Sequence, residues 1–177
     1  RGLGDVYKRQ YLNSLSLHQR DVIPALAAAG MHKEFLAYEN LDRKCSVFRT
    51  HLPDDTSLHR FYRRVDFIEQ MDEFQNKILH LEDTLIDTES NLWYVVLQKN
   101  LYKLGLSITV FEEHSSDIDA LVNRRNSIAH GNSRAGVTEA EFSKWENKVY
   151  RMLSDITRLL YDYANHQRYL KTPPTEQ

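Results

Sequence analysis

Apolar side chains between positions 142 and 163 recur at alternating steps of three and four residues. That period places them on one face of an α-helix. Thr138 and Glu141, just before the run, have the spacing of a helix-starting capping box. A helix with one apolar stripe must pack against other helices, so we expect a helical bundle with this stripe in its core. The stripe consists of Phe142, Trp145, Val149, Met152, Ile156, Leu159 and Tyr163.

The remaining periodic segments also predict helices, so the expected fold class is all-α. Helical periods cover residues 21–38, 58–81 and 116–130, and a fourth helix is expected over 89–104, begun by Asp87 or Thr88 and ended by Gly105. Arg60, Arg63 and Arg64 cluster within the second of these segments and are expected on a solvated face. No strand hairpin, repeat or low-complexity tract is apparent in the sequence.

Composition narrows the class of protein. A chain of 177 residues, 41% hydrophobic and 27% charged, is typical of one soluble globular domain. The net charge of −2 means that any nucleic-acid site would be a local basic feature. Cys45 is the single cysteine, which excludes an internal disulfide and favours a cytoplasmic location. No apolar run approaches the length of a membrane span, so no membrane association is expected.

The segment 121–131 contains the side chains best suited to chemistry. Arg125 shares a helical stripe with apolar neighbours, and Gly131 stands where a helix-ending glycine would. A guanidinium on a buried or interfacial stripe needs an anionic partner, because an unpaired charge there is costly. That partner could be a carboxylate of the protein or a phosphate from outside it. Beside the stripe runs a polar strip of Asn123, Asn126, Ser127 and His130.

This segment resembles the signature of the HEPN superfamily, the helical domains of many prokaryotic RNase toxins and antiviral effectors. That signature is an Arg, a polar residue, and a His after four to six positions, which Arg125, Asn126 and His130 match. The segment 87–92, followed by a helix that ends near Leu106, resembles the middle of the MAE-type or RiboL-PSP-like branch. The resemblance is clear over 84–135 and extends more thinly from about 20 to 166. It implies a HEPN-like helical bundle.

The resemblance and the local sequence together suggest three segments. Residues 1–10 resemble translated sequencing adapter and are expected to be non-native. Residues 11–170 are expected to form a single HEPN-like domain. Because proteins of this branch carry a long helix upstream, that domain is expected to lack its first helix. Residues 171–177, with two prolines, are expected to be a disordered tail.

Arg125 and His130 together could cleave RNA without a metal ion or cofactor. The ribose 2′-hydroxyl is the nucleophile, and His130 can act as base or acid near neutral pH. Arg125 stays protonated and can hold the phosphate in a bidentate fork. Asn126 could orient the phosphate or the imidazole, and Arg124 and Asn123 are candidate substrate-binding residues. The expected products, which the resemblance also implies, are a 2′,3′-cyclic phosphate and a 5′-hydroxyl.

The spacing of Arg125 and His130 limits how the two side chains can form one site. Five residues at about 100° each separate Arg125 and His130 by roughly 140° on an ideal helix. Either the helix distorts near His130 or two copies of the motif meet. The resemblance favours a homodimer through the Arg125 helix, with RNA as substrate and an antitoxin or associated defence protein as a further partner.

Two alternatives stay open at the level of sequence. Arg125 could pair with Glu112, Glu113 or Asp119 and simply lock the bundle, with His130 as a C-terminal cap favoured by the helix dipole. The domain could then be a non-catalytic RNA-binding or protein-interaction module. A metal site is not expected, because the histidines lack His-Glu-x-x-His spacing and cysteines do not pair.

Overall fold

The computed structural model describes residues 3–47, 55–131 and 136–173, with the backbone alone for residues 3–8. These residues form α-helices joined by turns, and within the described ranges there is no β-sheet, only two isolated antiparallel bridges. The predicted all-α class is confirmed. No helix in the described part of the chain combines the length and the apolar character needed to cross a bilayer. The helices are α1 Leu3–Ser14, α2 Pro24–Gly30, α3 His32–Glu39, α4 Thr56–Glu69, α5 Met71–Asn76, α6 Tyr94–Lys103, the 3₁₀ turn η1 Glu112–His114, α7 Ser115–Ala129 and α8 Glu139–Asn165.

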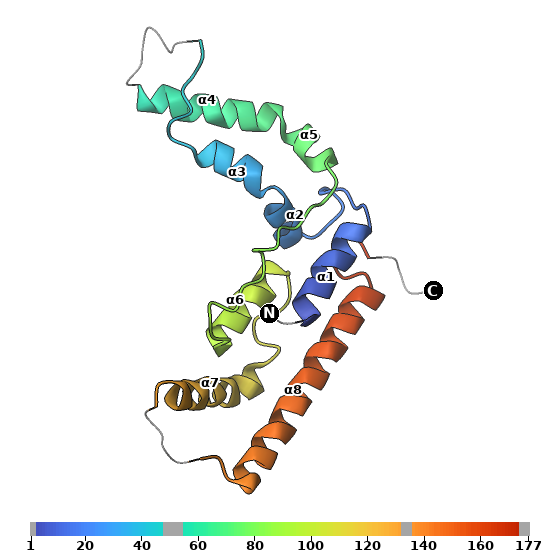
Figure 1. Cartoon of the computed structure of the whole chain (residues 1–177). Coiled ribbons are helices and arrows are strands. Elements are labelled where there is room, and N and C mark those ends of the chain that lie inside the picture. The colour runs from blue at the N-terminus through green and yellow to red at the C-terminus, as the bar shows by residue number, and fades with distance from the viewer. Residues whose placement is uncertain (1–2, 48–54, 132–135, 174–177) are drawn as a thin grey trace.

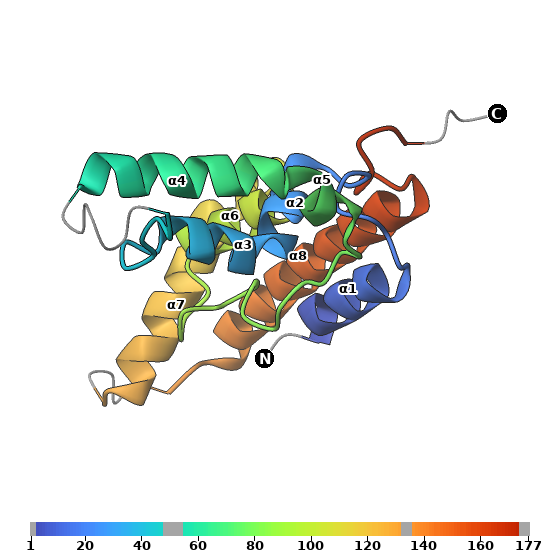
Figure 2. The same cartoon turned by 90° about the horizontal axis from the view of Figure 1, so that it is seen from above.

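The core lies where α1, α2, the end of α6 and the C-terminal part of α8 converge (Figure 1). The α3–α4 pair extends from one side of this centre, and α7 with the N-terminal part of α8 extends from the other. Seen from above, α1 lies along α8 while α7 diverges from it (Figure 2). The buried cluster consists of Leu12, Val22, Leu26, Leu79, Leu81, Leu104, Tyr163 and Tyr169.

The long C-terminal helix is confirmed, although only two of the seven residues of its apolar stripe are buried. Thr138 caps α8 by accepting a hydrogen bond from the Glu141 N–H at 3.2 Å. Met152 and Tyr163 are buried, as expected, but Phe142 is 58% exposed. The reason is geometric: α8 passes the core only with its C-terminal part, and its N-terminal part extends beyond it alongside α7 (Figure 1).

Two predicted helices are each divided in the structure. The segment 21–38 breaks at Met31, after Gly30, where an added Cβ would lie 2.8 Å from Leu79 Cδ1. The segment 58–81 is divided into α4, which ends at Glu69, and α5, which ends at Asn76. Beyond that point the backbone is extended, because the Leu79 N–H donates to Leu17 O at 2.7 Å and the Gln19 N–H to Lys77 O at 3.0 Å. Long-range backbone pairing there replaces the helical hydrogen bonds.

The apolar face of α4 is exposed, and one of its three clustered arginines is buried. Phe61 and Ile68, two of the apolar residues of this periodic segment, are 62% and 67% exposed. Arg63, expected on a solvated face, is 5% exposed, while Arg60 is exposed. The Arg63 guanidinium donates to the main-chain carbonyls of Tyr38 at 3.0 Å and Arg43 at 3.2 Å. Those bonds tie α4 to the end of α3, which explains how a charged side chain can occupy the inner face.

The two ends of the chain also differ from a simple reading of the sequence. Helix α1 includes residues 3–10, which continue into Tyr11 and the buried Leu12. A segment of any origin can adopt a helix when it extends one already begun, so the adapter interpretation and the missing first helix stay predictions. At the other end, Lys171 N–H donates to Asp21 O at 2.9 Å. The rest of the expected tail, 174–177, lies outside the described residues.

Candidate ribonuclease site on helix α7

Helix α7 carries the signature residues and ends as the sequence predicts. It runs from Ser115 to Ala129, and His130 is its C-terminal cap, with its N–H donating to Asn126 O at 2.9 Å. Gly131 follows with φ +68°, a left-handed conformation that glycine adopts without strain. None of the residues of α7 is fully buried. The helix packs against α6 and η1 and leaves much of its surface open.

Arg125 is exposed and is held by neutral acceptors. Its Nη1 donates to the side-chain oxygen of Asn91 at 3.0 Å and to that of Asn126 at 3.0 Å. Within the described ranges, no carboxylate forms a hydrogen bond or ion pair with this guanidinium. Amide oxygens orient a guanidinium without neutralising it, so the full positive charge of Arg125 remains available to a phosphate.

Two of the three carboxylates proposed as structural partners of Arg125 have other partners. Asp119 accepts a hydrogen bond from the Tyr94 N–H at 2.9 Å and so caps the start of α6 from a neighbouring helix. Glu113 lies 3.7 Å from His114 Nε2 and 3.7 Å from Arg151. Among the described residues, the Arg125 guanidinium bonds the amides of Asn91 and Asn126 and none of the carboxylates that the bundle-locking interpretation named.

Asn91 is the site residue that sequence reasoning missed. It belongs to the segment 87–92, which was expected to begin the next helix, but α6 starts only at Tyr94. Glu89 and Ser90 adopt positive φ, 48° and 70°, and this turn carries Asn91 to the side of α7. The segment 87–92 and the segment 121–131, the two parts of the resemblance, therefore meet in space. The resemblance of both segments to one family was therefore the feature of the sequence that could have indicated Asn91.

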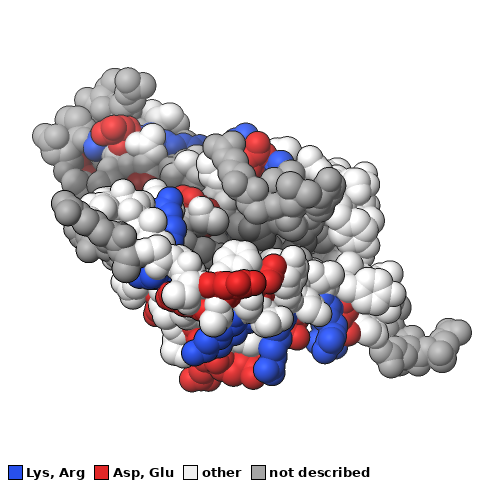
Figure 3. Space-filling view, turned by 60° about the horizontal axis from the view of Figure 1, so that its bottom comes forward, with Lys and Arg blue, Asp and Glu red and all other residues white. Residues whose placement is uncertain are grey.

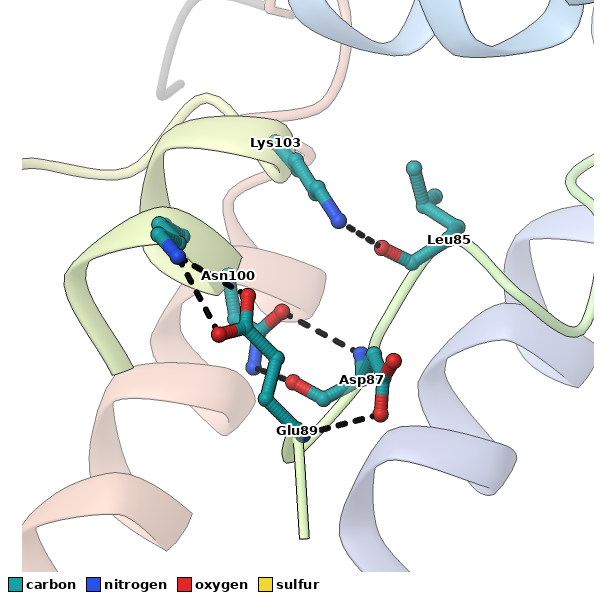
Figure 4. Close-up of polar contacts among 6 residues, drawn as sticks. Leu85, Asp87, Glu89, Asn100 and Lys103 are labelled. Atoms are coloured by element: carbon teal, nitrogen blue, oxygen red, sulfur yellow. Dashed lines mark hydrogen bonds and ion pairs between the residues drawn. The ribbon is translucent and has the colours of Figure 1, made fainter. Parts of the chain in front are cut away.

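A polar cluster fixes the loop that precedes Asn91 onto α6 (Figure 4). Asn100 Nδ2 donates to Asp87 O at 2.8 Å, and its side-chain oxygen accepts from the Asp87 N–H at 3.3 Å. The Asp87 carboxylate accepts from the Glu89 N–H at 2.9 Å, and Lys103 Nζ donates to Leu85 O at 3.0 Å. Asn100 is buried, so these bonds are shielded from water. The cluster makes the loop a defined support for Arg125.

His130 lies at the other side of the same helix end. Its imidazole is exposed, and no hydrogen bond or ion pair of this ring occurs within the described part of the chain. The α-helical bond from its own N–H to Asn126 shows that the helix is regular up to this point. The angle of roughly 140° between Arg125 and His130 on an ideal helix therefore applies, and one chain does not place both on one face.

The two candidate substrate-binding residues differ in their surroundings. Arg124 is half-buried and faces the start of α8, where its Nε lies 3.5 Å from Glu141 Oε1 and its Nη2 3.5 Å from Gly136 O. Asn123 is exposed on α7. Arg124 is thus already engaged by a carboxylate, unlike Arg125.

The surface around α7 and the N-terminal part of α8 carries both positive and negative side chains (Figure 3). Figure 3 shows Lys and Arg side chains interleaved with Asp and Glu on the face that contains the lower part of the molecule in Figure 1. This pattern agrees with the net charge of −2. Attraction of an anionic ligand by one chain would therefore depend on individual cations such as Arg125, and not on a broad basic surface.

The all-α fold is consistent with a helical domain of the HEPN superfamily, and sequence comparison shows the family. A family model described as RiboL-PSP-HEPN matches residues 3–162, nearly the whole chain. The protein therefore belongs to the RiboL-PSP-HEPN family. Comparisons with curated proteins and with solved structures found no match.

Proposed function

We propose that this protein is a metal-independent endoribonuclease of the HEPN type, acting as a toxin or antiviral defence effector. In the proposed reaction the ribose 2′-oxygen attacks the adjacent phosphorus and the bond to the 5′-oxygen breaks. The 2′-hydroxyl proton passes to a base, and an acid protonates the leaving oxygen. The products are a 2′,3′-cyclic phosphate and a 5′-hydroxyl.

The observation that carries the proposal is the state of Arg125. Its guanidinium is exposed, oriented by the amide oxygens of Asn91 and Asn126, and not neutralised by a carboxylate of the described residues. Such a group fits the role of binding a phosphate and stabilising the negative charge that develops on it. Asn126 would hold the guanidinium in position, and the exposed His130 would transfer protons.

Assembly completes the proposed site. Because Arg125 and His130 do not share a face of α7, we assign them to opposite sides of a cleft formed by two copies. A two-fold dimer through α7 brings Arg125 of one protomer toward His130 of its partner and doubles the local positive charge. The absence of fully buried residues from α7, and the exposure of Ile128 and Ala129, are compatible with this interface. Asn123 and Arg124 would contact RNA beside it.

The first experiment is cleavage of total RNA in EDTA by the wild-type chain, Arg125→Ala and His130→Ala. Cleavage in EDTA that is lost in both variants is the expected result. Asn147→Ala, an exposed polar change on α8, serves as the matched control and should cut like wild type. Cleavage that persists in both site variants would place the chemistry elsewhere or reveal a contaminant.

The shared cleft makes a quantitative prediction for mixed variants. Exchange between Arg125→Ala and His130→Ala dimers forms about half heterodimers, each with one intact composite site. Activity should then recover to about a quarter of wild type, although each variant alone is inactive. Absence of any recovery, with heterodimers shown by native mass spectrometry, would contradict a cleft in which the two chains supply different residues.

The alternative is a non-catalytic RNA-binding or protein-interaction module on the same fold. Its expected signature is a folded dimer that binds RNA without cutting it, and whose expression is harmless with or without His130. A toxic wild type and a harmless His130→Ala variant would exclude it. An antitoxin or associated defence protein is a further proposed partner, and the proposed location is the cytoplasm.

A further inference from the structure

Three side chains that could bind a metal meet at the junction between η1 and α8. His114 Nε2 lies 3.3 Å from Asp155 Oδ2 and 3.7 Å from Glu113 Oε1. The three ligand atoms all lie within 4.8 Å of one another. His114 is buried, at 7% exposure, Asp155 is half-buried, and Glu113 is exposed, so one side of the group faces solvent.

These separations are close to those of ligands that share one metal ion. Imidazole nitrogen and carboxylate oxygen bind Zn²⁺ at about 2.0–2.2 Å. Two such ligands at a tetrahedral angle are then roughly 3.3–3.6 Å apart, by the geometry of those bond lengths. The distances of 3.3 Å and 3.7 Å from His114 Nε2 fall at or near this range. The Glu113 and Asp155 oxygens lie within 4.8 Å of each other and would have to approach for all three atoms to coordinate one ion, a movement that the exposed Glu113 side chain can make.

The local charges also favour a cation. Two carboxylates converge on one imidazole, and the nearby cation is Arg151, 3.7 Å from the second oxygen of Glu113 and exposed. The next ion pair along the same junction, Lys148 with Asp117 at 2.5 Å, is self-contained. A divalent ion would offset the repulsion between Glu113 and Asp155 and leave Arg151 free to turn into solvent.

We propose that Glu113, His114 and Asp155 form a binding site for a divalent first-row transition-metal ion such as Zn²⁺, with water at the remaining positions. Mixed nitrogen and oxygen ligation suits these ions better than Mg²⁺ or Ca²⁺, which prefer oxygen alone. The ion would join η1, and through it the start of α7, to the middle of α8. The site was not visible in the sequence because 41 residues separate His114 from Asp155.

This site is separate from the proposed ribonuclease site. His114 precedes the first residue of α7, and Arg125 lies eleven positions further, about 16 Å along a helix at 1.5 Å per residue. The ion would act as a structural tie that fixes the orientation of α7. Cleavage of RNA in EDTA and binding of Zn²⁺ are therefore independent outcomes, and either can fail alone.

The test is titration of the untagged chain with Zn²⁺ by isothermal calorimetry, with thermal unfolding in parallel. We expect one ion per chain, and a rise in Tm of about 5–10 °C at a hundredfold excess over Kd. Asp155→Asn and Glu113→Gln keep the shape of the side chains and should each weaken binding about tenfold or more. His166→Gln is the matched control, because it removes a histidine that pairs with Asp162 at 2.8 Å elsewhere.

Co²⁺ supplies a second readout, because its visible absorption reports ligand geometry directly. The wild-type chain should give a d–d spectrum that is lost in His114→Gln, with circular dichroism used to confirm that this variant is folded. Mg²⁺ at the same concentration should shift the Tm much less than Zn²⁺. Zn²⁺ affinity that is unchanged in Asp155→Asn and Glu113→Gln, or the lack of any Tm shift at millimolar Zn²⁺, would overturn the proposal.

Discussion

Replacing Asn91 by aspartate tests whether Arg125 binds phosphate, because it adds a charge without changing shape. The Asn91 side-chain oxygen lies 3.0 Å from Arg125 Nη1, and a carboxylate can accept the same hydrogen bond. The substitution therefore preserves the orientation of the guanidinium and offsets its charge. A phosphate would then have to compete with an internal anion.

The magnitude follows from the distance and the exposure. Two unit charges at this separation attract by about 1.4 kcal/mol in water, and measured exposed ion pairs are worth up to about 1 kcal/mol. Because Arg125 is exposed, the weaker value applies. RNA affinity should fall about three- to tenfold in Asn91→Asp. The slope of log K against log salt should also decrease in magnitude, by up to about 0.7, the value for one lost phosphate contact on a single strand.

The assay is RNA binding by fluorescence anisotropy at several salt concentrations, in a His130→Ala background that cannot cut the ligand. Asn147→Asp on α8 supplies the same change in net charge at an exposed side chain that bonds Ser143 O and not Arg125. This control should alter the RNA affinity and the salt slope much less than Asn91→Asp does. Equal effects of the two substitutions, or no change in the salt slope for Asn91→Asp, would refute the assignment of Arg125 to phosphate.

Three further predictions concern stability. Gly105 has φ +68° and an added Cβ would lie 2.3 Å from Ile23 Cδ1, so Gly105→Ala should lower the free energy of unfolding by about 2–4 kcal/mol in urea titrations. Gly131→Ala shares the φ of +68° but meets nothing within 4 Å, so it should cost only about 1 kcal/mol; equal losses would contradict the steric part of this argument. Burial raises the pKa of Tyr163, so the wild type should lose stability as pH rises above about 10, where the phenol of the unfolded chain ionises first. Tyr163→Phe should reduce this loss at high pH, and it should cost about 1–2 kcal/mol at pH 7 because it removes the hydrogen bond to Leu104 O. Thermal unfolding at several pH values would measure both effects.

The sequence predicted those parts of the fold that depend on local signals. The capping residue Thr138 and the helix-ending Gly131 mark real boundaries, and the apolar period of α8 is real. The breaks after Gly30 and at Gln70 were both missed, and the first accommodates the close approach of Leu79, a residue far away in the chain. A periodic pattern registers which residues share a face, but not whether that face meets a partner.

The same limit explains the errors at α4 and at the candidate site. On α4 the arginines were expected on a solvated face, whereas Arg63 occupies the inner face by binding main-chain carbonyls. Such partners have no side-chain signature in a sequence. Asn91 was placed within the helix expected over 89–104, because the positive φ values that turn it toward Arg125 cannot be read from Glu89 and Ser90. The Arg125–Asn91 bond joins residues 34 positions apart and the Arg63–Tyr38 bond residues 25 positions apart, so neither could be predicted without the three-dimensional fold.

The lack of fully buried residues on α7 has a consequence for local stability within the folded state. Backbone amides of a helix that buries little can exchange their hydrogens through local opening, without unfolding of the core. Those of α7 should therefore exchange with deuterium earlier than the amides around the buried Leu101 of α6 or Tyr163 of α8. Whatever covers this helix, whether a second protomer or RNA, would slow that exchange. Deuterium exchange of the α7 amides would therefore show whether this helix is covered, without any attached label.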